Sequence, residues 1–450
     1  MNRKVADGLF YALLLITQII AAIFYGIYHD HIWDSTSTLA AGVSAFSGKY
    51  PLFMDIHIMV YVGIGFLWAF LKRYRLSGIT EVFWISAITV QYYFLWDALF
   101  QGAWTTFGHF NITQANWNLA EYCAISMTIA FGAFIGKANN LQMLIATLIG
   151  VLLYSVNEKI LFVSLDVQDI GGSMSIWTFG AFYGLGVSWW LNYKESKESR
   201  NWITDHLSNN FALIGTLFLW CFFPSFNSAD TNNVWSFNIA VVNTYFCLIG
   251  SLIGSYLTSK ILYKGKFHVE HILNATLVGG IIMGSGADIL RDSFVAYIVG
   301  GVFGIFATWS YTSVSKILMK VGLNDVSGVF HTFGIPGIIG GLLSSIYRAR
   351  YASRGGIQVA GTFISFAISL AGGLLVGLVI RWLGSHQDEN EYYNDEVNVH
   401  FDDASEFDAN PQGLLEKRNR LLFGSVNHRA YARQGTEGDA LNDREATPQY

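Results

Sequence analysis

Apolar runs long enough to cross a bilayer follow one another through most of this chain, and they constrain its fold more than any other feature. A helix of roughly 20 apolar residues spans the hydrocarbon layer of a membrane. Only helices and closed barrels satisfy their backbone hydrogen bonds in lipid, and these runs are continuous rather than alternating. Charged residues make up only 13% of the chain, against roughly 25% in soluble domains. We therefore predict an all-α integral membrane protein.

About twelve of the runs qualify as spanning helices. Their approximate limits are 8–28, 51–71, 79–100, 117–136, 141–163, 169–192, 209–226, 236–262, 267–289, 292–318, 326–347 and 358–384. Glycines are clustered in the later spans, where small residues let membrane helices approach closely. The sequence thus predicts a membrane domain of residues 1–385, followed by a cytoplasmic and largely disordered tail of residues 386–450.

Lysine and arginine residues in the short loops favour an orientation with both termini in the cytoplasm. With the N-terminus inside, the inner loops hold most of these residues, and the outer loops hold only Lys49, Arg291, Arg348, Arg350 and Arg354. The three arginines that precede the last span are an exception that the sequence does not explain.

A glycosylation sequon suits the same orientation. Asn111 begins an Asn-Ile-Thr sequence in the loop 101–116, which this topology places outside. A chance match explains so short a pattern equally well. Asn111 is therefore a candidate N-glycosylation site.

Two segments of the chain match each other in the manner of an inverted repeat. In each, an aspartate is followed three positions later by glycine and eight positions later by an aromatic residue, Asp169 to Trp177 and Asp325 to Phe333. The predicted spans that carry them run in opposite directions, an arrangement that brings equivalent residues together near the midplane. We expect Trp177 and Phe333 to face each other, and the two aspartates to cap the helices that follow them.

A series of longer motifs occurs in order between residues 51 and 341. The motifs are Pro51–Met59, Leu71–Tyr74, Phe131–Lys137, Asn157–Glu158, Asp169–Met174, Gly215–Trp220, Pro224–Ala229, His271–Gly280 and Gly334–Gly341. Together they resemble the Rh (Rhesus) glycoproteins, the Rh branch of the ammonium transporter/Rh family. The resemblance implies twelve helices with an inverted internal repeat, a homotrimer or a heterotrimer with other Rh-type chains, and a location in the plasma membrane.

The resemblance also implies one narrow pore per subunit that conducts ammonia or ammonium, with methylammonium or carbon dioxide as other cargo. It implies an outer aromatic gate, matched by Tyr122 and Phe226, and an acid that supports the recruitment of ammonium, matched by Asp169. The two mid-pore histidine positions of the family correspond to Trp177 and Phe333 in this sequence.

That replacement changes what the pore can do. A pair of imidazoles can share a proton, whereas indole only donates a hydrogen bond and benzene does neither. The two larger rings are also able to plug a narrow passage. His331 is a candidate substitute, although two helical positions before Phe333 turn it about 200° away from the pore. The alternative is therefore a non-conducting or weakly conducting Rh-type subunit with a structural or regulatory role.

Other classes of function find little support in the sequence. There is no nucleophile–base pairing, metal-ligand spacing or phosphate-binding loop, so we expect neither an enzyme nor a bound cofactor or metal. No basic stripe indicates nucleic acid. Asp55, His57 and Glu158 lie in apolar runs, where we expect them to form interior polar pairs.

Overall fold

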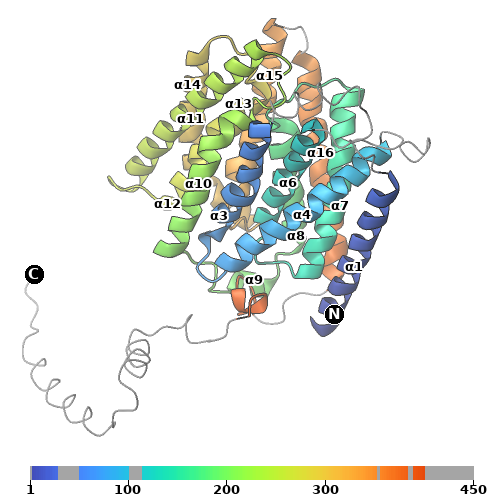
Figure 1. The fold of residues 1–450 in the computed structure, drawn as a ribbon. Coiled ribbons are helices and arrows are strands. Elements are labelled where there is room, and N and C mark those ends of the chain that lie inside the picture. The colour runs from blue at the N-terminus through green and yellow to red at the C-terminus, as the bar shows by residue number, and fades with distance from the viewer. Residues whose placement is uncertain (1–2, 29–49, 101–113, 352–354, 384–388, 401–450) are drawn as a thin grey trace, which may run out of the picture. The chain divides into compact units, whose positions relative to one another are not determined.

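The computed structural model describes residues 3–28, 50–100, 114–351, 355–383 and 389–400 of the chain. Within these ranges, twelve successive helical segments form a bundle (Figure 1). They are α1 (Arg3–Tyr28), the segment Tyr50–Phe70 with α3 (Gly65–Leu67), α4 (Arg75–Phe100), α6 (Gln114–Phe134), α7 (Asn140–Glu158), α8 (Phe179–Trp190), α10 (His206–Phe226), α11 (Val234–Leu262), α12 (Val269–Asn274) with α13 (Val278–Met283), α14 (Ser293–Lys320), α15 (Ile335–Tyr351) and α16 (Gly355–Ile380). A short helix, α9 (Lys194–Glu198), lies between α8 and α10.

The twelve segments confirm the number of spans that the apolar runs predict. In the described part of the chain, seven of the segments are continuous helices long and apolar enough to cross a membrane on their own. In α8, α13 and α15 the regular helix is shorter, because turns of π- or 3-10 helix interrupt these spans.

Polar caps define where several helices begin. Asn139 and Gln142 form a capping box at the start of α7, in which each side chain binds the backbone of the other. Asp205 and Ser208 form a second capping box at the start of α10. Such caps satisfy backbone N–H groups that the first turn of a helix leaves without partners. The loops therefore contain the signals that separate one apolar run from the next.

Glycines allow α11 and α14 to pack backbone against backbone. A Cβ atom on Gly300 would lie 2.0 Å from the carbonyl oxygen of Cys247, and one on Gly304 would lie 2.4 Å from that of Ser251. No real Cβ atom tolerates such distances, so only glycine fits at these positions. The glycine clusters in the sequence thus mark helix contacts, as expected for membrane helices.

The two matched sequence segments adopt the same local structure. Gly172 has a positive φ of 67° and Gly328 one of 74°. Each is followed by a turn of π-helix, Ser173–Thr178 in one segment and Phe330–Gly334 in the other. A left-handed backbone followed by a widened helical turn is uncommon, so its occurrence twice supports the inverted repeat.

The two aspartates of the repeat cap these π-turns. Asp169 accepts hydrogen bonds from the backbone N–H groups of Met174 at 3.1 Å and Ser175 at 2.7 Å. Asp325 accepts from those of Val329 at 3.1 Å and Phe330 at 2.8 Å. The capping interpretation of both residues therefore agrees with the geometry.

A segment beyond α16, Glu389–Asn398, packs on the end of the bundle that carries α9 (Figure 1). Tyr392 and Tyr393 are fully buried there, and the backbone N–H of Tyr393 donates to the carbonyl of Gly136 at 3.2 Å. The Asp395 carboxylate accepts from a backbone N–H in the first turn of α4 at 2.7 Å. The folded unit thus extends past the boundary expected at residue 385, and the tail from residue 401 lies outside the described residues.

Candidate functional site

Trp177 and Phe333 lie face to face inside the bundle. Their ring centroids are 5.7 Å apart and their planes differ by 10°. Each ring is 1% exposed. One ring comes from each of the two π-turns of the repeat, so the repeat geometry brings them together as the sequence suggested. The indole N–H of Trp177 is bonded to the carbonyl of Gly171 at 2.8 Å.

Further rings extend this stack towards the end of the bundle that carries the loop between α10 and α11. Phe226 lies 5.3 Å from Trp177, and Tyr122 lies 4.9 Å from Phe226 in an edge-to-face contact. The two residues proposed as an outer gate are therefore neighbours of each other and of the stack. Phe223 also lies 5.3 Å from Trp177. Sequence reasoning missed Phe223, although its place one helical turn before Phe226 was a usable signal.

One more ring contacts Phe333. Trp68 makes an edge-to-face contact with Phe333 at 6.2 Å between centroids and is 1% exposed. Sequence reasoning missed this residue, and no periodic pattern in its apolar run distinguishes it. The rings form what we call the aromatic column: Tyr122, Phe226, Phe223, Trp177, Phe333 and Trp68.

His331 is not part of the aromatic column. Its Nδ1 lies 3.0 Å from the hydroxyl of Ser310 and its Nε2 lies 2.8 Å from that of Ser315, both on α14. Its ring also packs on Tyr311, at 4.8 Å between centroids. His331 therefore points to α14 and away from Phe333, as ideal helical geometry predicts. This finding corrects the inclusion of His331 among the candidate pore residues.

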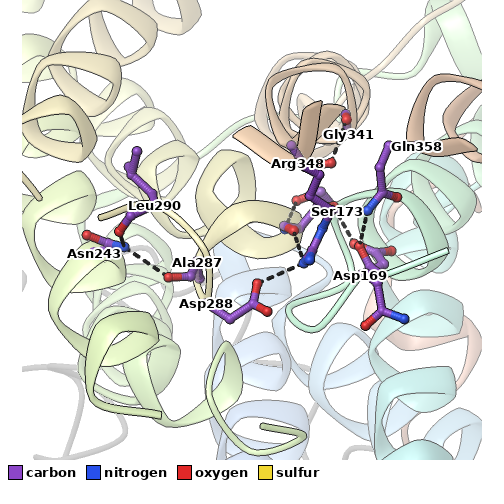
Figure 2. Close-up of polar contacts among 12 residues, drawn as sticks. Asp169, Ser173, Asn243, Ala287, Asp288, Leu290, Gly341, Arg348 and Gln358 are labelled. Atoms are coloured by element: carbon purple, nitrogen blue, oxygen red, sulfur yellow. Dashed lines mark hydrogen bonds and ion pairs between the residues drawn. The ribbon is translucent and has the colours of Figure 1, made fainter. Parts of the chain in front are cut away.

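The Asp169 carboxylate is occupied by a network of hydrogen bonds within the protein. Besides its two backbone partners, it accepts hydrogen bonds from the hydroxyls of Ser175, at 2.8 Å, and Ser285. The carbonyl of Ser285 in turn accepts from Arg348 at 3.3 Å. Figure 2 shows Arg348 between Asp169 and Asp288. The guanidinium of Arg348 forms an ion pair with the carboxylate of Asp288, at 2.8 Å between nitrogen and oxygen.

This pairing explains why Arg348 departs from the charge bias. Its side chain is 6% exposed and forms an ion pair inside the bundle, so it is not a free charge in a loop. Arg291 and Arg350 both lie over the ring of Tyr351, at 5.0 and 5.5 Å. Arg354 lies outside the described residues. Of the three exceptional arginines, the two in the described residues, Arg348 and Arg350, therefore have local partners.

The three polar residues singled out in the apolar runs, Asp55, His57 and Glu158, have polar partners, as expected. Nδ1 of His57 lies 2.7 Å from the carboxylate of Glu121, and Glu158 accepts from the hydroxyl of Tyr93 at 2.8 Å. Asp55 accepts from a serine hydroxyl of α10 at 2.7 Å. These contacts compensate for polar groups placed in apolar surroundings.

A cavity of about 320 Å³ opens at the other end of the aromatic column. Its lining comes from the loop before α10, the start of α12, the turn that contains Trp68, and the chain before the second π-turn. This is the end of the bundle that the charge bias in the sequence predicts to face the cytoplasm. In the described residues, no cluster of three or more His, Cys, Asp or Glu side chains is arranged to hold a metal ion.

The aromatic column offers few groups that could take part in proton transfer. The indole N–H groups of Trp177 and Trp68 are both bonded to backbone carbonyls, at 2.8 Å each. The phenylalanine rings offer neither a donor nor an acceptor. The column can therefore exclude water and attract a cation to a ring face, but it cannot pass a proton from one side chain to the next.

Comparison with known proteins agrees with this architecture. The model of the ammonium transporter family matches residues 11–404. The ammonium transporter Rh type C of Homo sapiens is 36% identical over 420 residues, covering 84% of this chain and 86% of the relative. That of Xenopus tropicalis is 37% identical over 382 residues, covering 78% and 80%.

Solved structures agree as well. Nitrosomonas europaea Rh50 aligns with a TM-score of 0.73 and 27% identity, covering 84% of this chain and 99% of that one. Saccharomyces cerevisiae Mep2 aligns with a TM-score of 0.65 over 79% and 93% of the two chains, but at 15% identity it supports the fold alone. The chain is thus a member of the ammonium transporter family and belongs to its Rh branch.

Proposed function

We propose that this chain is an Rh-type channel for ammonia whose pore is restricted by the aromatic column. The observation that supports this most is the stack of Trp177 on Phe333, at 5.7 Å between centroids. These are the positions to which the family resemblance assigns the paired histidines. With no imidazole to share a proton, ammonium must give its proton to water on the outer side of the stack and cross as neutral ammonia. Passage also requires the two rings to move apart.

Tyr122 and Phe226 are the proposed recruitment site for ammonium or methylammonium. Their rings meet edge to face at 4.9 Å on the outer side of Trp177. A cation over such a ring face gains on the order of 1 kcal/mol. Asp169 has the supporting role of fixing the π-turn that carries Trp177, since its hydrogen bonds hold that turn.

A second candidate is a non-conducting Rh-type subunit, which is favoured by the close packing of the column. Trp177, Phe333, Phe226 and Phe223 are each at most 1% exposed, and Tyr122 is 3% exposed. Such a subunit would assemble with other Rh-type chains, as a homotrimer or a heterotrimer, and regulate or anchor them. Native mass measurement in mild detergent tests this assembly, and a monomer alone would contradict it.

Both candidates share one membrane arrangement. We place the protein in the plasma membrane with both termini in the cytoplasm and a glycan on Asn111. Asn111 lies outside the described residues. A cysteine introduced by Thr106→Cys should react with an impermeant reagent added outside, and the glycan should be lost in Asn111→Gln. Labelling of that cysteine only from the cytoplasm would contradict the arrangement.

The two candidate functions can be distinguished by measuring the internal pH of proteoliposomes that contain the purified protein. An ammonium gradient raises the internal pH when neutral ammonia enters, and a carbon dioxide gradient lowers it. We expect the purified protein to speed the rise with ammonium above that of empty liposomes. Faster acidification with carbon dioxide alone would assign the channel to that gas. No effect of either gradient would favour the non-conducting subunit.

A further inference from the structure

Trp68 closes the aromatic column from the side of the cavity. The family resemblance gives no role to this residue. Its ring lies against Phe333 at 6.2 Å between centroids, with an angle of 68° between the planes. The ring is buried, with 1% of its surface exposed. Phe333 is therefore in contact with two buried indoles, one stacked on it and one edge to face with it.

Two contacts fix the Trp68 ring in this position. Its indole N–H donates to the carbonyl of Thr128 on α6 at 2.8 Å. On the same helix, Gly132 leaves room for the ring, because a Cβ atom there would lie 2.3 Å from the Trp68 side chain. The 3-10 turn Trp68–Phe70 ends the span and presents the ring to α6. The indole is thus held by a hydrogen bond to α6 and by close packing against Gly132.

The cavity ends at this ring. Trp68 lines the cavity together with Leu67, Leu273, Asn274 and Val326, among others, whereas Phe333 is absent from its walls. Trp68 both lines the cavity and contacts Phe333, so it is the member of the aromatic column that reaches the cavity. A solute that enters the cavity from the cytoplasm would meet Trp68 before it meets the stack.

We propose that Trp68 is an inner gate, a barrier in series with the Trp177–Phe333 stack. As a gate for conduction, this role rests on the proposed channel function. Barriers in series predict a specific pattern of uptake. Trp68→Leu alone should raise uptake by a smaller factor than it does once the stack is replaced, because the intact stack still limits the parent. In a variant in which the stack has been replaced by histidines, adding Trp68→Leu should raise uptake further.

Thiol labelling tests the position of the gate without any transport. The background is Cys221→Ser, because Cys221 is the exposed native cysteine and the other two are buried. Phe333→Cys places a thiol behind Trp68, and Val326→Cys places a matched control thiol on the cavity wall. A small thiol reagent is added from the side on which Val326→Cys reacts. We expect Phe333→Cys to stay unlabelled with Trp68 present and to react when Trp68→Leu is added.

The control thiol keeps each outcome informative. If Val326→Cys is still labelled when Trp68→Leu is present, the protein with Trp68→Leu is folded. If the protein with Trp68→Leu does not fold, Trp68→Met replaces Trp68→Leu in the experiment. Labelling of Phe333→Cys while Trp68 is present would overturn the proposal. So would a lack of labelling in both Trp68 variants when the control reacts. Since labelling does not depend on what the protein conducts, failure here is distinct from failure of the channel proposal.

Discussion

The indole N–H of Trp177 donates to the backbone carbonyl of Gly171 at 2.8 Å. Indole has one donor and no acceptor, so this bond uses its full hydrogen-bonding capacity. Gly171 is itself held by a bond from its N–H to the carbonyl of Gly284 at 3.1 Å. The central ring of the aromatic column is therefore anchored to the backbone of two spans and has no hydrogen-bonding group left to offer to a permeating molecule.

The repeat depends on two left-handed glycines, which gives a test of the fold. Gly172→Ala and Gly328→Ala should each lower the free energy of unfolding by at least about 1–2 kcal/mol, the usual cost of this backbone conformation. Added Cβ atoms would also meet Ile176 at 2.2 Å and Tyr311 at 2.3 Å. Gly265→Ala is the control, because Gly265 has a φ of 90° with nothing within 4 Å. Thermal unfolding in detergent should rank both repeat variants below this control, and equal losses in all three would contradict the account.

Lys137 should stabilise the inner end of the second π-turn. It is fully buried and donates to the hydroxyl of Ser188 at 3.0 Å and to the carbonyl of Asn324. Lys137→Met leaves those acceptors without partners, at a cost of roughly 1–3 kcal/mol. Lys194→Met is the matched control, since the Lys194 side chain is 81% exposed. Thermal unfolding should show a lower midpoint for the first variant alone, and an unchanged midpoint for both would refute this role.

Asp205 predicts a dependence of stability on pH. Burial alone would raise the pKa of Asp205, but hydrogen bonds from Ser208 and the nearby Arg75 lower it below its usual value. A carboxyl with a lowered pKa stabilises the folded state above its unfolded pKa of about 3.9, and the contribution is lost as the pH falls through the folded value. Asp205→Ala should therefore cost about 1 kcal/mol at neutral pH, with a cost that shrinks in acid.

A neutral cap provides the control for that experiment. Asn233 caps α11 by accepting from the backbone N–H of Ser236 at 2.8 Å, and its amide does not titrate. Asn233→Ala should have the same effect at every pH at which the protein stays folded. Unfolding midpoints measured in parallel would contradict the assignment if the Asp205→Ala effect were equally constant.

The architecture could be predicted from sequence because it depends on local and periodic signals. Apolar runs fix the spans, and an aspartate, a glycine and an aromatic residue at matched spacing reveal the repeat that stacks Trp177 on Phe333. Arg348 shows the limit of such signals. Its position in the chain suggests an outer loop, but a partner 60 residues away, Asp288, holds it inside.

Contacts between distant segments explain the remaining differences. Trp68 stands in an apolar run like many other residues, and its ring is fixed by the 3-10 turn together with Thr128 and Gly132 on another helix. Tyr392 and Tyr393 stand in a charged stretch without periodicity, and yet they are buried against the bundle. Neither hydropathy nor spacing along the chain contains this information.

The central claim is that the aromatic stack limits conduction, and replacement of both rings tests it most directly. Trp177→His with Phe333→His removes two large rings and supplies groups that can share a proton in an apolar passage. Loss of packed aromatic bulk can cost on the order of 3 kcal/mol, so surface density must be measured alongside. Trp220→His with Phe218→His makes the same changes on α10 outside the column and serves as the control.

The measurement is uptake of labelled methylammonium in cells that lack their own ammonium transporters, normalised to surface density. The account predicts more uptake by the double-histidine variant than by the parent, still more when Trp68→Leu is added, and no rise in the control. If the double-histidine variant reaches the surface normally and takes up no more than the parent, with or without Trp68→Leu, the aromatic stack does not limit this protein and the account is contradicted.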